Sequence, residues 1–493
     1  MITKVVVLAI YVAILFLIGI FASRKVKSMS DFYVGGKNMG FWAVAFSARA
    51  TGESGWLLIG LTGMGALAGM SGYWVVLGEV LGVFISWFFM AKLFKRKSDS
   101  YDAITIPDYL QSHFKSTTNT LRILSASVLS IFVIIYVSSQ IDATGIAFES
   151  LLGMNYFAGA LLGFGIVLVY IFIGGFVAAV WSDMFQGLLM FFGLVLLPIV
   201  VWFSMDHGQG IISGLNAIDP ALTDIWGGHE DVWMNVFTIL GFSMIGLGFL
   251  GSPQVYVRFM SIRNEEEIDK GKWVALAFTF LTDAAAVTIG ILARVLFTKS
   301  GQDPEAIFGI GATDVLKLMT ENFLPYVLVA IYVAIVLSAI MSTIDSLLII
   351  ASSAITRDFY QKIFHPEIKD EDLTKLSRIV TIVMALIALA IAMTIAILSP
   401  ERQVFWVIIF GWSGIAATFC PVIILSLFWK GYTEKGAIAS MIAGFLSVIV
   451  IKFVFQNLEG VGPYFQALDV LAPSFAVAMI FGWIFSKLDT KKI

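Results

Sequence analysis

The sequence predicts an all-α polytopic membrane protein with about thirteen transmembrane helices. Of its 493 residues, 59% are hydrophobic and only 13% are charged, whereas about 25% of a typical soluble domain is charged. Apolar runs long enough to cross about 30 Å of hydrocarbon recur along the whole chain. No linker rich in Pro or Ser separates a second domain, so we expect residues 1–493 to form a single transmembrane domain.

These apolar runs are expected to cross the membrane one after another. The first run follows Met-Ile-Thr-Lys at the start of the chain, but no small-residue cleavage site follows it, so we expect a retained helix and not a signal peptide. The expected spans are approximately 4–22, 41–68, 71–94, 120–150, 155–175, 176–204, 233–257, 273–298, 323–356, 379–398, 404–429, 436–456 and 471–487.

The positions of Lys and Arg predict the orientation. With the N-terminus outside, most of the 31 Lys and Arg residues fall in cytoplasmic segments, as the positive-inside rule requires. The long outside loops 206–232 and 457–470 contain neither residue. We therefore expect the C-terminus inside. The cytoplasmic segments on this assignment are 23–40, 92–122, 258–272, 357–378, 430–435 and 487–493.

The composition also excludes several classes of function. The net charge of −3 and the absence of a basic tail argue against a nucleic-acid partner, and no obligate protein partner is evident. The chain has no phosphate-binding Gly-Lys motif and no His near a nucleophile, so we do not expect an enzyme. The single cysteine, Cys420, excludes an internal disulfide, and the four histidines lack the spacing of a metal site.

Two five-span blocks, 41–204 and 233–429, lie between the extra helix 4–22 and two C-terminal helices at 436–487. The first span of each block is interrupted, at Thr51-Gly-Glu-Ser-Gly55 and at Gly246-Leu-Gly-Phe-Leu-Gly-Ser-Pro253. Because five is odd, the blocks enter the membrane in opposite orientations. Such paired, interrupted helices indicate a midplane binding site in secondary transporters. The alternative is that these glycines only allow close packing between helices.

Ionisable residues inside the expected spans are the next clue. A charge at this depth costs about 2.5–3.5 kcal/mol on insertion scales, so it normally faces a cavity or a partner. On a continuous helix Arg49 and Glu53 would form an ion pair. If Gly52 breaks the helix, Arg49 would instead pair with Asp142 or another acid. The ionisable residues are Arg49, Glu53, Glu79, Asp142, Asp183, Asp283 and Asp345, and the sequence offers no partner for Glu79 or Asp283.

A cluster of oxygen-bearing side chains occurs in Ala339-Ile-Met-Ser-Thr-Ile-Asp-Ser346. A single hydroxyl in a membrane helix usually bonds to the preceding turn of its own helix. A desolvated alkali cation, however, needs several hard oxygen ligands. The clustering of Ser342, Thr343, Asp345 and Ser346 within about one turn therefore makes this segment a candidate sodium site.

Longer motifs resemble the sodium:solute symporter family, and within it most closely the bacterial sodium/proline symporters. The resemblance runs through nearly the whole chain. The motifs that carry it are Asp31-Phe-Tyr-Val-Gly-Gly-Lys37, Ser54-Gly-Trp-Leu-Leu-Ile-Gly60, Ile106-Pro-Asp-Tyr-Leu110, Phe172-Ile-Gly-Gly-Phe-Val-Ala-Ala-Val-Trp-Ser-Asp183, Met341-Ser-Thr343, Ser352-Ser-Ala-Ile-Thr-Arg-Asp358 and Gly411-Trp-Ser-Gly414.

The resemblance implies a leucine-transporter-like 5+5 inverted repeat, with discontinuous first and sixth core helices, in a bacterial-type plasma (inner) membrane. It also implies Na+ as the co-transported ion. The implied sodium ligands are the carbonyls of Ala50, Glu53 and Ala339 and the hydroxyls of Ser342 and Thr343. Asp183 matches an aspartate that is important for sodium in the family, and a second sodium site near Asp183, Ser342 and Ser346 occurs in some relatives.

The resemblance further implies sodium-coupled uptake of a small zwitterionic solute, most simply L-proline. The alternatives are another small solute, such as a monocarboxylate, another amino acid or a sugar, or a channel-like or sensory protein. Gly52 and Glu53 depart from the proline-symporter pattern, as do Ile245 and Phe249. The expected substrate positions are Ser54, Gly55, Trp56, Tyr136, Phe249 and Pro253.

Overall fold

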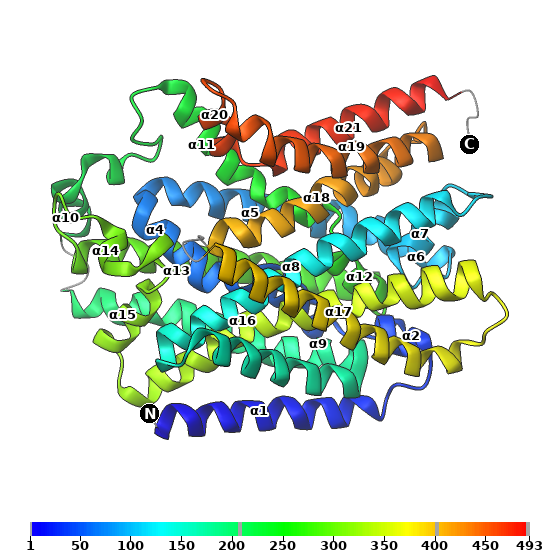
Figure 1. Ribbon diagram of the computed structural model, residues 1–493, viewed down its shortest axis with the longest axis horizontal. Helices are drawn as coiled ribbons and strands as arrows, with labels where there is room; N and C mark the ends of the chain where they lie inside the picture. Colours follow the sequence, from blue (N-terminus) through cyan, green and yellow to red (C-terminus); the bar gives the residue numbers. More distant parts are fainter. Residues whose placement is uncertain (1, 206–209, 400–403, 490–493) are drawn as a thin grey trace.

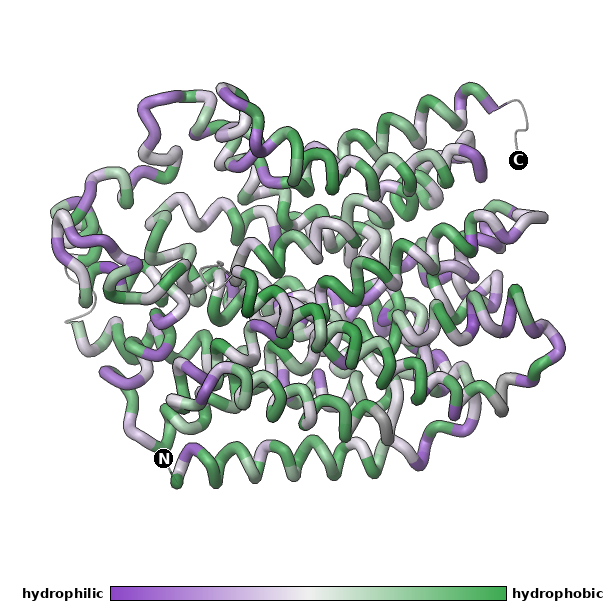
Figure 2. Tube along the Cα trace, viewed as in Figure 1, coloured by the Kyte–Doolittle hydropathy of each residue, from purple (hydrophilic) through white to green (hydrophobic). Residues whose placement is uncertain are grey.

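The computed structural model describes residues 2–205, 210–399 and 404–489, and the chain folds almost entirely into helices over these ranges. Most of the helices run roughly along the long axis of the molecule (Figure 1). Hydrophobic residues fill their middle parts, and hydrophilic residues gather towards the two ends (Figure 2). The predicted all-α polytopic class is thereby confirmed.

The helix boundaries follow the apolar runs of the sequence. The α-helices are α1 Ile2–Ser23, α2 Met29–Val34, α3 Phe41–Gly55, α4 Thr62–Ala68, α5 Tyr73–Ile85, α6 Ala91–Ser100, α7 Ile106–His113, α8 Thr120–Leu152, α9 Tyr156–Ser204, α10 Ile211–Ile218, α11 Val232–Met244, α12 Pro253–Ser261, α13 Glu265–Phe297, α14 Pro304–Phe308, α15 Val315–Phe323, α16 Tyr326–Ser353, α17 Asp370–Leu398, α18 Val404–Phe428, α19 Glu434–Phe453, α20 Gly462–Leu468 and α21 Leu471–Leu488.

Eleven helices among the described residues are long and apolar enough to cross a membrane. This count is smaller than the thirteen spans expected from the sequence, for two reasons. The 60-residue run Phe41–Ser100 counts as one helix, although at about 1.5 Å per residue it is far too long for one crossing. Gly69, with φ +60°, turns the chain within it. The apolar stretch Tyr156–Val169 is shorter than a full span, and Gly175, with φ +54°, kinks α9 after it.

Both helices predicted to be interrupted are interrupted. In α3 the backbone leaves the helical region at Ser54 (φ +49°, ψ −168°), and a π-helical turn, η2 Trp56–Leu61, carries the chain on to α4. The break therefore falls after Glu53 and not at Gly52. The second interrupted helix changes from α11 to the 3-10 turn η6 Ile245–Leu250, and α12 then begins at Pro253. Proline suits this position because the first turn of a helix does not need its N–H.

The α16 helix lies at the centre of the bundle, where it packs against α3, α8 and α9. Its residues are buried almost without interruption from Val329 to Ser353. By contrast, α1 lies at one edge of the view and the α19–α21 pair at the other (Figure 1). This arrangement places the hydroxyl cluster of α16 against the interrupted α3, deep inside the protein.

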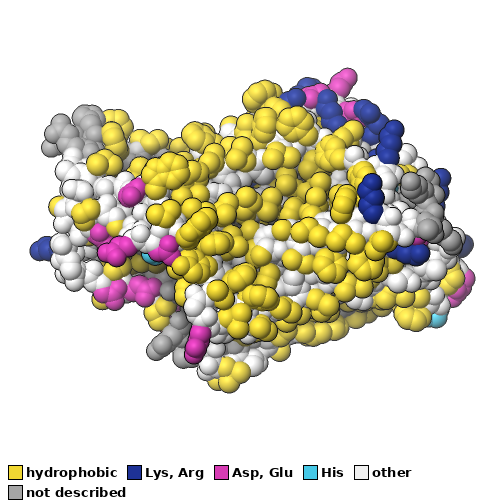
Figure 3. All heavy atoms as spheres, turned by 90° about the horizontal axis from the view of Figure 1, so that it is seen from above, with side chains coloured by type: hydrophobic (Ala, Val, Ile, Leu, Met, Phe, Trp, Pro, Cys, Tyr) yellow, Lys and Arg dark blue, Asp and Glu magenta, His cyan; other side chains and the backbone are white. Residues whose placement is uncertain are grey.

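The two ends of the molecule differ in charge. On the face drawn in Figure 3, Lys and Arg gather at one end of a broad apolar band, and the charged side chains at the other end are mainly Asp and Glu.

Helices α2, α6 and α7 lie at the same end of the bundle (Figure 1). An isolated parallel bridge between Met39 and Ile262 joins the segments that follow α2 and α12.

A charged network holds α7 against the bundle. Asp108 accepts from Arg122 Nη1 at 2.7 Å and from Arg357 Nε at 2.8 Å, and Arg122 also pairs with Asp358 at 2.5 Å. Burial alone would raise the pKa of Asp108, but Arg357 and Arg122 outweigh this effect and lower it below the usual value. The ion pairs of Asp108 therefore stabilise the folded state at neutral pH, and their contribution is lost as the pH falls through the lowered pKa of this carboxyl.

We expect Asp108→Asn to lower the free energy of unfolding by about 3 kcal/mol, because it leaves two buried guanidinium groups short of a counter-charge. Thermal melting of the purified protein in detergent measures the change. The control is Asp102→Asn, since the Asp102 side chain is 99% exposed and such surface pairs contribute little. Equal melting temperatures for the two variants would contradict a stabilising role of the network.

Candidate functional site

The hydroxyl groups of α16 reach the backbone of α3 just before its break. Ser342 Oγ donates to the Ala50 carbonyl at 3.0 Å, and Thr343 Oγ1 donates to the Thr51 carbonyl at 3.0 Å. Both hydroxyls also lie near the Ala339 carbonyl, at 3.1 and 3.3 Å. All of these residues are buried. Three carbonyl oxygens and two hydroxyl oxygens thus converge where the two helices meet.

This oxygen set is the kind that binds a hard monovalent cation, because carbonyls and hydroxyls can replace its water shell. Four of the five residues implied by the resemblance, Ala50, Ala339, Ser342 and Thr343, come together here. The Glu53 carbonyl instead accepts from the Trp56 N–H. The carbonyl that accepts from Thr343 is that of Thr51, which was not expected from the sequence because backbone oxygens carry no residue signature.

Asp183 lies beside this cluster and accepts several hydrogen bonds through one carboxylate oxygen, Oδ2. The donors are Ser47 Oγ at 2.6 Å, Arg258 Nη2 at 3.1 Å and Thr51 Oγ1 at 3.4 Å. Ser346 Oγ lies 3.5 Å from the same oxygen and donates to Asp345 at 2.9 Å. The hydroxyl of Thr51 is thus bonded near Asp183, while its carbonyl bonds to α16.

Arg258, expected in a cytoplasmic segment, instead lies within α12 and within the candidate span Val232–Ser261. Its side chain is completely buried. It contacts Asp183, Ser346 and Ser47, and its Nη1 donates to the Gln254 carbonyl at 2.7 Å. The available signal was a lone Arg among apolar residues directly after the second break. The error arose because α12 continues the interrupted helix inwards past the point where the apolar run ends.

The residues implied to bind substrate gather around the break of α3. Tyr136 Oη donates to Ser54 Oγ at 3.4 Å, and the Gly55 N–H donates to Gln140 at 3.1 Å. Trp56 Nε1 donates back to the Gly52 carbonyl at 3.2 Å. None of these side chains is more than 3% exposed, so the structure is closed around them.

Phe249 packs against Trp412, which in turn packs against Tyr136 near the break of α3. The rings of Phe249 and Trp412 lie 5.1 Å apart between centroids, and those of Tyr136 and Trp412 lie 6.4 Å apart. Trp412 Nε1 donates to the Ile245 carbonyl at 3.1 Å, which fixes its ring beside the second break. Trp412 belongs to the Gly411-Trp-Ser-Gly414 motif, for which the sequence predicted no particular role. Pro253 begins α12, and no described contact joins it to this group.

The charged residues of the first interrupted helix form a cluster of their own. Arg49 pairs with Glu53 and lies 3.8 Å from Glu79, and its guanidinium carbon lies 4.3 Å from the centre of the Phe249 ring. Asp142 accepts from Tyr156 at 2.6 Å. Of the two pairings left open by the sequence, the structure shows the i, i+4 pair, because the helix continues past Gly52 to Glu53.

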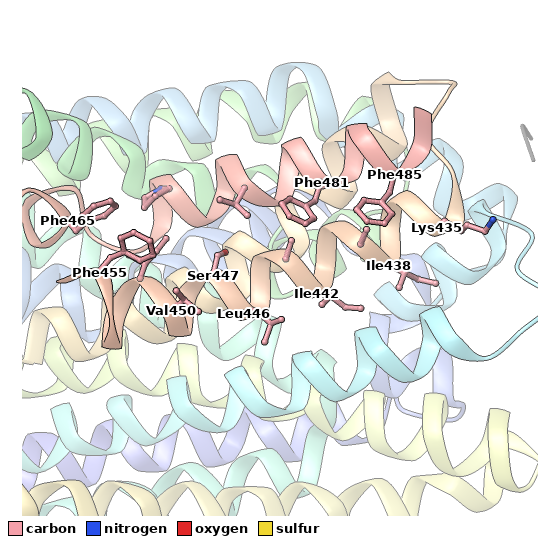
Figure 4. Close-up of a pocket in the computed structure, with 15 residues that line it drawn as sticks. Lys435, Ile438, Ile442, Leu446, Ser447, Val450, Phe455, Phe465, Phe481 and Phe485 are labelled. Carbon is pink, nitrogen blue, oxygen red and sulfur yellow. The ribbon is translucent and has the colours of Figure 1, made fainter. Parts of the chain in front are cut away.

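A cavity of about 780 Å³ lies elsewhere, in a crevice between α19 and α21 (Figure 4). Its lining is apolar apart from Lys435 and Ser447. Many of the lining side chains are exposed on the outer surface, for example Leu446 at 50%. Its lining includes none of the polar residues at the helix breaks.

Comparison with known proteins places this geometry in context. The model of the sodium:solute symporter family matches residues 32–444. The chain is 33% identical over 476 residues to the high-affinity proline transporter PutP of Bacillus subtilis (strain 168), covering 94% of this chain and 97% of the relative. It is 30% identical over 495 residues to the sodium/proline symporter of Staphylococcus aureus (strain JH9), covering 99% and 93%.

Among solved structures, the fold is similar to that of a Na+-coupled sialic acid symporter in its substrate-bound outward-open state. The TM-score is 0.78 at 18% identity, and the match covers 100% of this chain and 99% of the other. MHP1, a nucleobase-cation-symport-1 family transporter, matches with a TM-score of 0.53 at 13% identity over 93% and 95%. Both likenesses concern the fold.

The contact between the two breaks predicts the effect of a small substitution. A Cβ at position 52 would lie 2.6 Å from Phe249 Cε1 and 3.0 Å from Cζ. We therefore expect Gly52→Ala to cost about 2 kcal/mol through overpacking, and Phe249→Leu to relieve most of that cost.

Thermal melting of the two single variants and the double variant measures this coupling as a double-mutant cycle. Gly165→Ala is the control, since its Cβ would meet nothing within 4 Å. Additive effects of Gly52→Ala and Phe249→Leu would show that residues 52 and 249 are not in tight steric contact.

Proposed function

The chain belongs to the sodium:solute symporter family, and we propose on this premise that it takes up a small zwitterionic solute together with sodium. L-proline is the first candidate solute, because the relatives that align over nearly the whole chain are named proline transporters. The chain acts as a transporter in this proposal and catalyses no covalent reaction.

One observation carries the proposal: the Ser342 and Thr343 hydroxyls meet backbone carbonyls of α3 next to its break. We assign sodium to the oxygen atoms of Ala50, Glu53, Ala339, Ser342 and Thr343, with the Thr51 carbonyl alongside. Sodium at this position would tie α16 to the interrupted helix and hold the break in one conformation. Uptake of the ion is thereby linked to the shape of the neighbouring solute site.

Asp183 and Ser346 support this site from one side. Asp183 accepts from the Thr51 hydroxyl, so it helps to orient the backbone that faces Thr343. The buried Arg258 neutralises the carboxylate and links α12 to the same group. A sodium ion near Asp183, Ser342 and Ser346 would have to share these atoms with the guanidinium group, so we propose only one ion between α3 and α16.

The solute would bind where the two breaks approach each other. The Tyr136 hydroxyl and the amides of Gly55 and Trp56 are donors that could turn to a carboxylate, as free amides at helix ends commonly do. Trp56 and Phe249 supply apolar walls for a small ring. Ser54 would contribute its hydroxyl, and Pro253 would shape the second break.

Transport requires the site to open to each side in turn. We propose that residues 41–204 and 233–429 are inverted repeats that rock against one another, with helix 4–22 and the helices of 436–487 as additions. The N-terminus would lie outside and the C-terminus inside, so that the Lys- and Arg-rich end in Figure 3 faces the cytoplasm. In a bacterial-type inner membrane, the potential would add about 2.3 kcal/mol per charge per 100 mV.

A thermal-shift screen tests the solute. Amino acids, monocarboxylates and sugars are added to the purified protein with and without sodium, and uptake into proteoliposomes follows for each solute that stabilises it. We expect proline to raise the melting temperature only when sodium is present. Sodium-dependent stabilisation by a monocarboxylate alone would identify a monocarboxylate, and not proline, as the solute. Uptake that does not depend on sodium would overturn the proposed symport.

Substitution of the α16 hydroxyls tests the ion site. We expect Ser342→Ala and Thr343→Ala each to weaken apparent sodium affinity about tenfold, which corresponds to a loss of about 1.4 kcal/mol. Sodium-dependent uptake at saturating solute measures it. Ser352→Ala is the matched control, because its hydroxyl bonds within α16 to Ile349. An equal response of all three variants would refute the assigned ligands.

A further inference from the structure

Three buried acids from three different helices converge behind the break of α3. Glu53 lies on α3, Glu79 on α5 and Asp283 on α13, and each is 0% exposed. One carboxylate oxygen from each acid lies within 4.8 Å of the other two. None of these three acids belongs to the oxygen set assigned above through its side chain.

The charges in this cluster do not balance. Arg49 pairs with Glu53 and lies 3.8 Å from Glu79, and within the described part of the chain it is the only base that forms an ion pair with any of the three acids. Three carboxylates and one guanidinium leave an excess of two negative charges. Like charges at this separation in a buried site cannot all persist without a further positive charge.

Polar atoms in the cluster also lack partners. Both carboxylate oxygens of Glu79 and Oδ2 of Asp283 are buried without a hydrogen-bond partner in the described structure. The remaining Asp283 oxygen accepts from the Thr282 hydroxyl at 3.2 Å. Buried carboxylate oxygens are normally bonded, so the two helices direct unsatisfied acceptors at one point.

The spacing of these oxygens suits a metal ion. Ligand oxygens that lie on opposite sides of a hard cation are separated by up to about 5 Å, because each lies about 2.3–2.6 Å from the ion. The observed spacing of 4.8 Å or less falls within this limit. A single ion could therefore touch all three carboxylates after small side-chain adjustments, and a monovalent ion would lower the excess from two negative charges to one.

We propose that Glu53, Glu79 and Asp283 form a second sodium site, separate from the one between α3 and α16. This inference rests on the sodium-coupled transport proposed above. Sodium is favoured over a divalent ion because a transported ion must leave again in each cycle, and three desolvated carboxylates would hold a divalent ion tightly.

The position of the cluster couples it to both neighbouring sites. Glu53 lies within the same helical turn as Ala50 and Thr51, whose carbonyls face α16. Arg49 joins the acids to the Phe249 ring, 4.3 Å away. An ion among the acids would share Glu53 and Glu79 with Arg49, and its arrival or departure would change the position of Arg49 over the solute wall.

Equilibrium binding of radioactive sodium to the purified protein tests the proposal. We expect close to two ions per chain in the wild type and close to one in Glu79→Gln and in Asp283→Asn. The Ser342→Ala/Thr343→Ala double variant should also retain one ion, because it removes the other site. Asp469→Asn, at a buried acid next to α21, is the control and should retain two.

The outcomes separate this inference from the proposed function. One ion per chain in the wild type, lost in the Ser342→Ala/Thr343→Ala variant and kept in Glu79→Gln, overturns the second site and leaves the symporter intact. No bound sodium at all overturns both. Displacement of the second ion by micromolar calcium assigns the acids to a divalent ion, and a single ion at every pH from 6 to 9 shows that protons satisfy them.

If Glu79→Gln or Asp283→Asn is too unstable to purify, sodium-dependent uptake by the wild type in membrane vesicles gives a second measurement. Two coupled ions should give a sigmoidal dependence on sodium with a Hill coefficient well above one, and the ratio of sodium to solute influx should approach two. A hyperbolic dependence together with a ratio of one would overturn the proposal without any variant.

Discussion

The junction between α16 and the interrupted α3 is the interaction on which the arrangement of this protein depends. A helix that breaks inside a membrane exposes backbone carbonyls that hydrocarbon cannot satisfy, so they must find protein partners or a ligand. Here Ser342 and Thr343 donate to the carbonyls of Ala50 and Thr51. Because α16 is buried along most of its length, this junction also fixes the position of α3 among α8, α9 and α13.

Buried charge follows from the same constraint. Arg258 and Asp183 neutralise one another next to the junction, whereas Arg49 only partly neutralises the acids behind it. A complete ion pair is neutral and costs little beyond its desolvation. A group of buried acids that is only partly neutralised needs a further cation or proton from its surroundings. The first arrangement therefore suits a structural role, and the second suits a site whose contents change during the transport cycle.

Much of this organisation could be predicted from the sequence, because the bilayer makes long apolar runs and breaks within them easy to recognise. Both interrupted helices and the hydroxyl cluster were predicted at the right segments. The observed break at Ser54 falls inside the expected Thr51–Gly55 segment, whereas Gly52, the alternative break point, stays helical and allows close contact with Phe249. Contacts made by backbone atoms or between distant helices, such as those of Thr51 and Trp412, leave no local signal. Arg258 was misplaced because the hydrophobic run ends before the helix does.

The lone cysteine has a practical consequence. Cys420 is buried, with its sulfur 3.4 Å from the Gly248 carbonyl at the second break. A thiol reagent that modifies only accessible cysteines would therefore leave it unlabelled. Pairs of cysteines introduced at opposite ends of the bundle could carry spin labels or fluorophores in an otherwise native chain. Distances between chosen helices thus become measurable without first building a cysteine-free background.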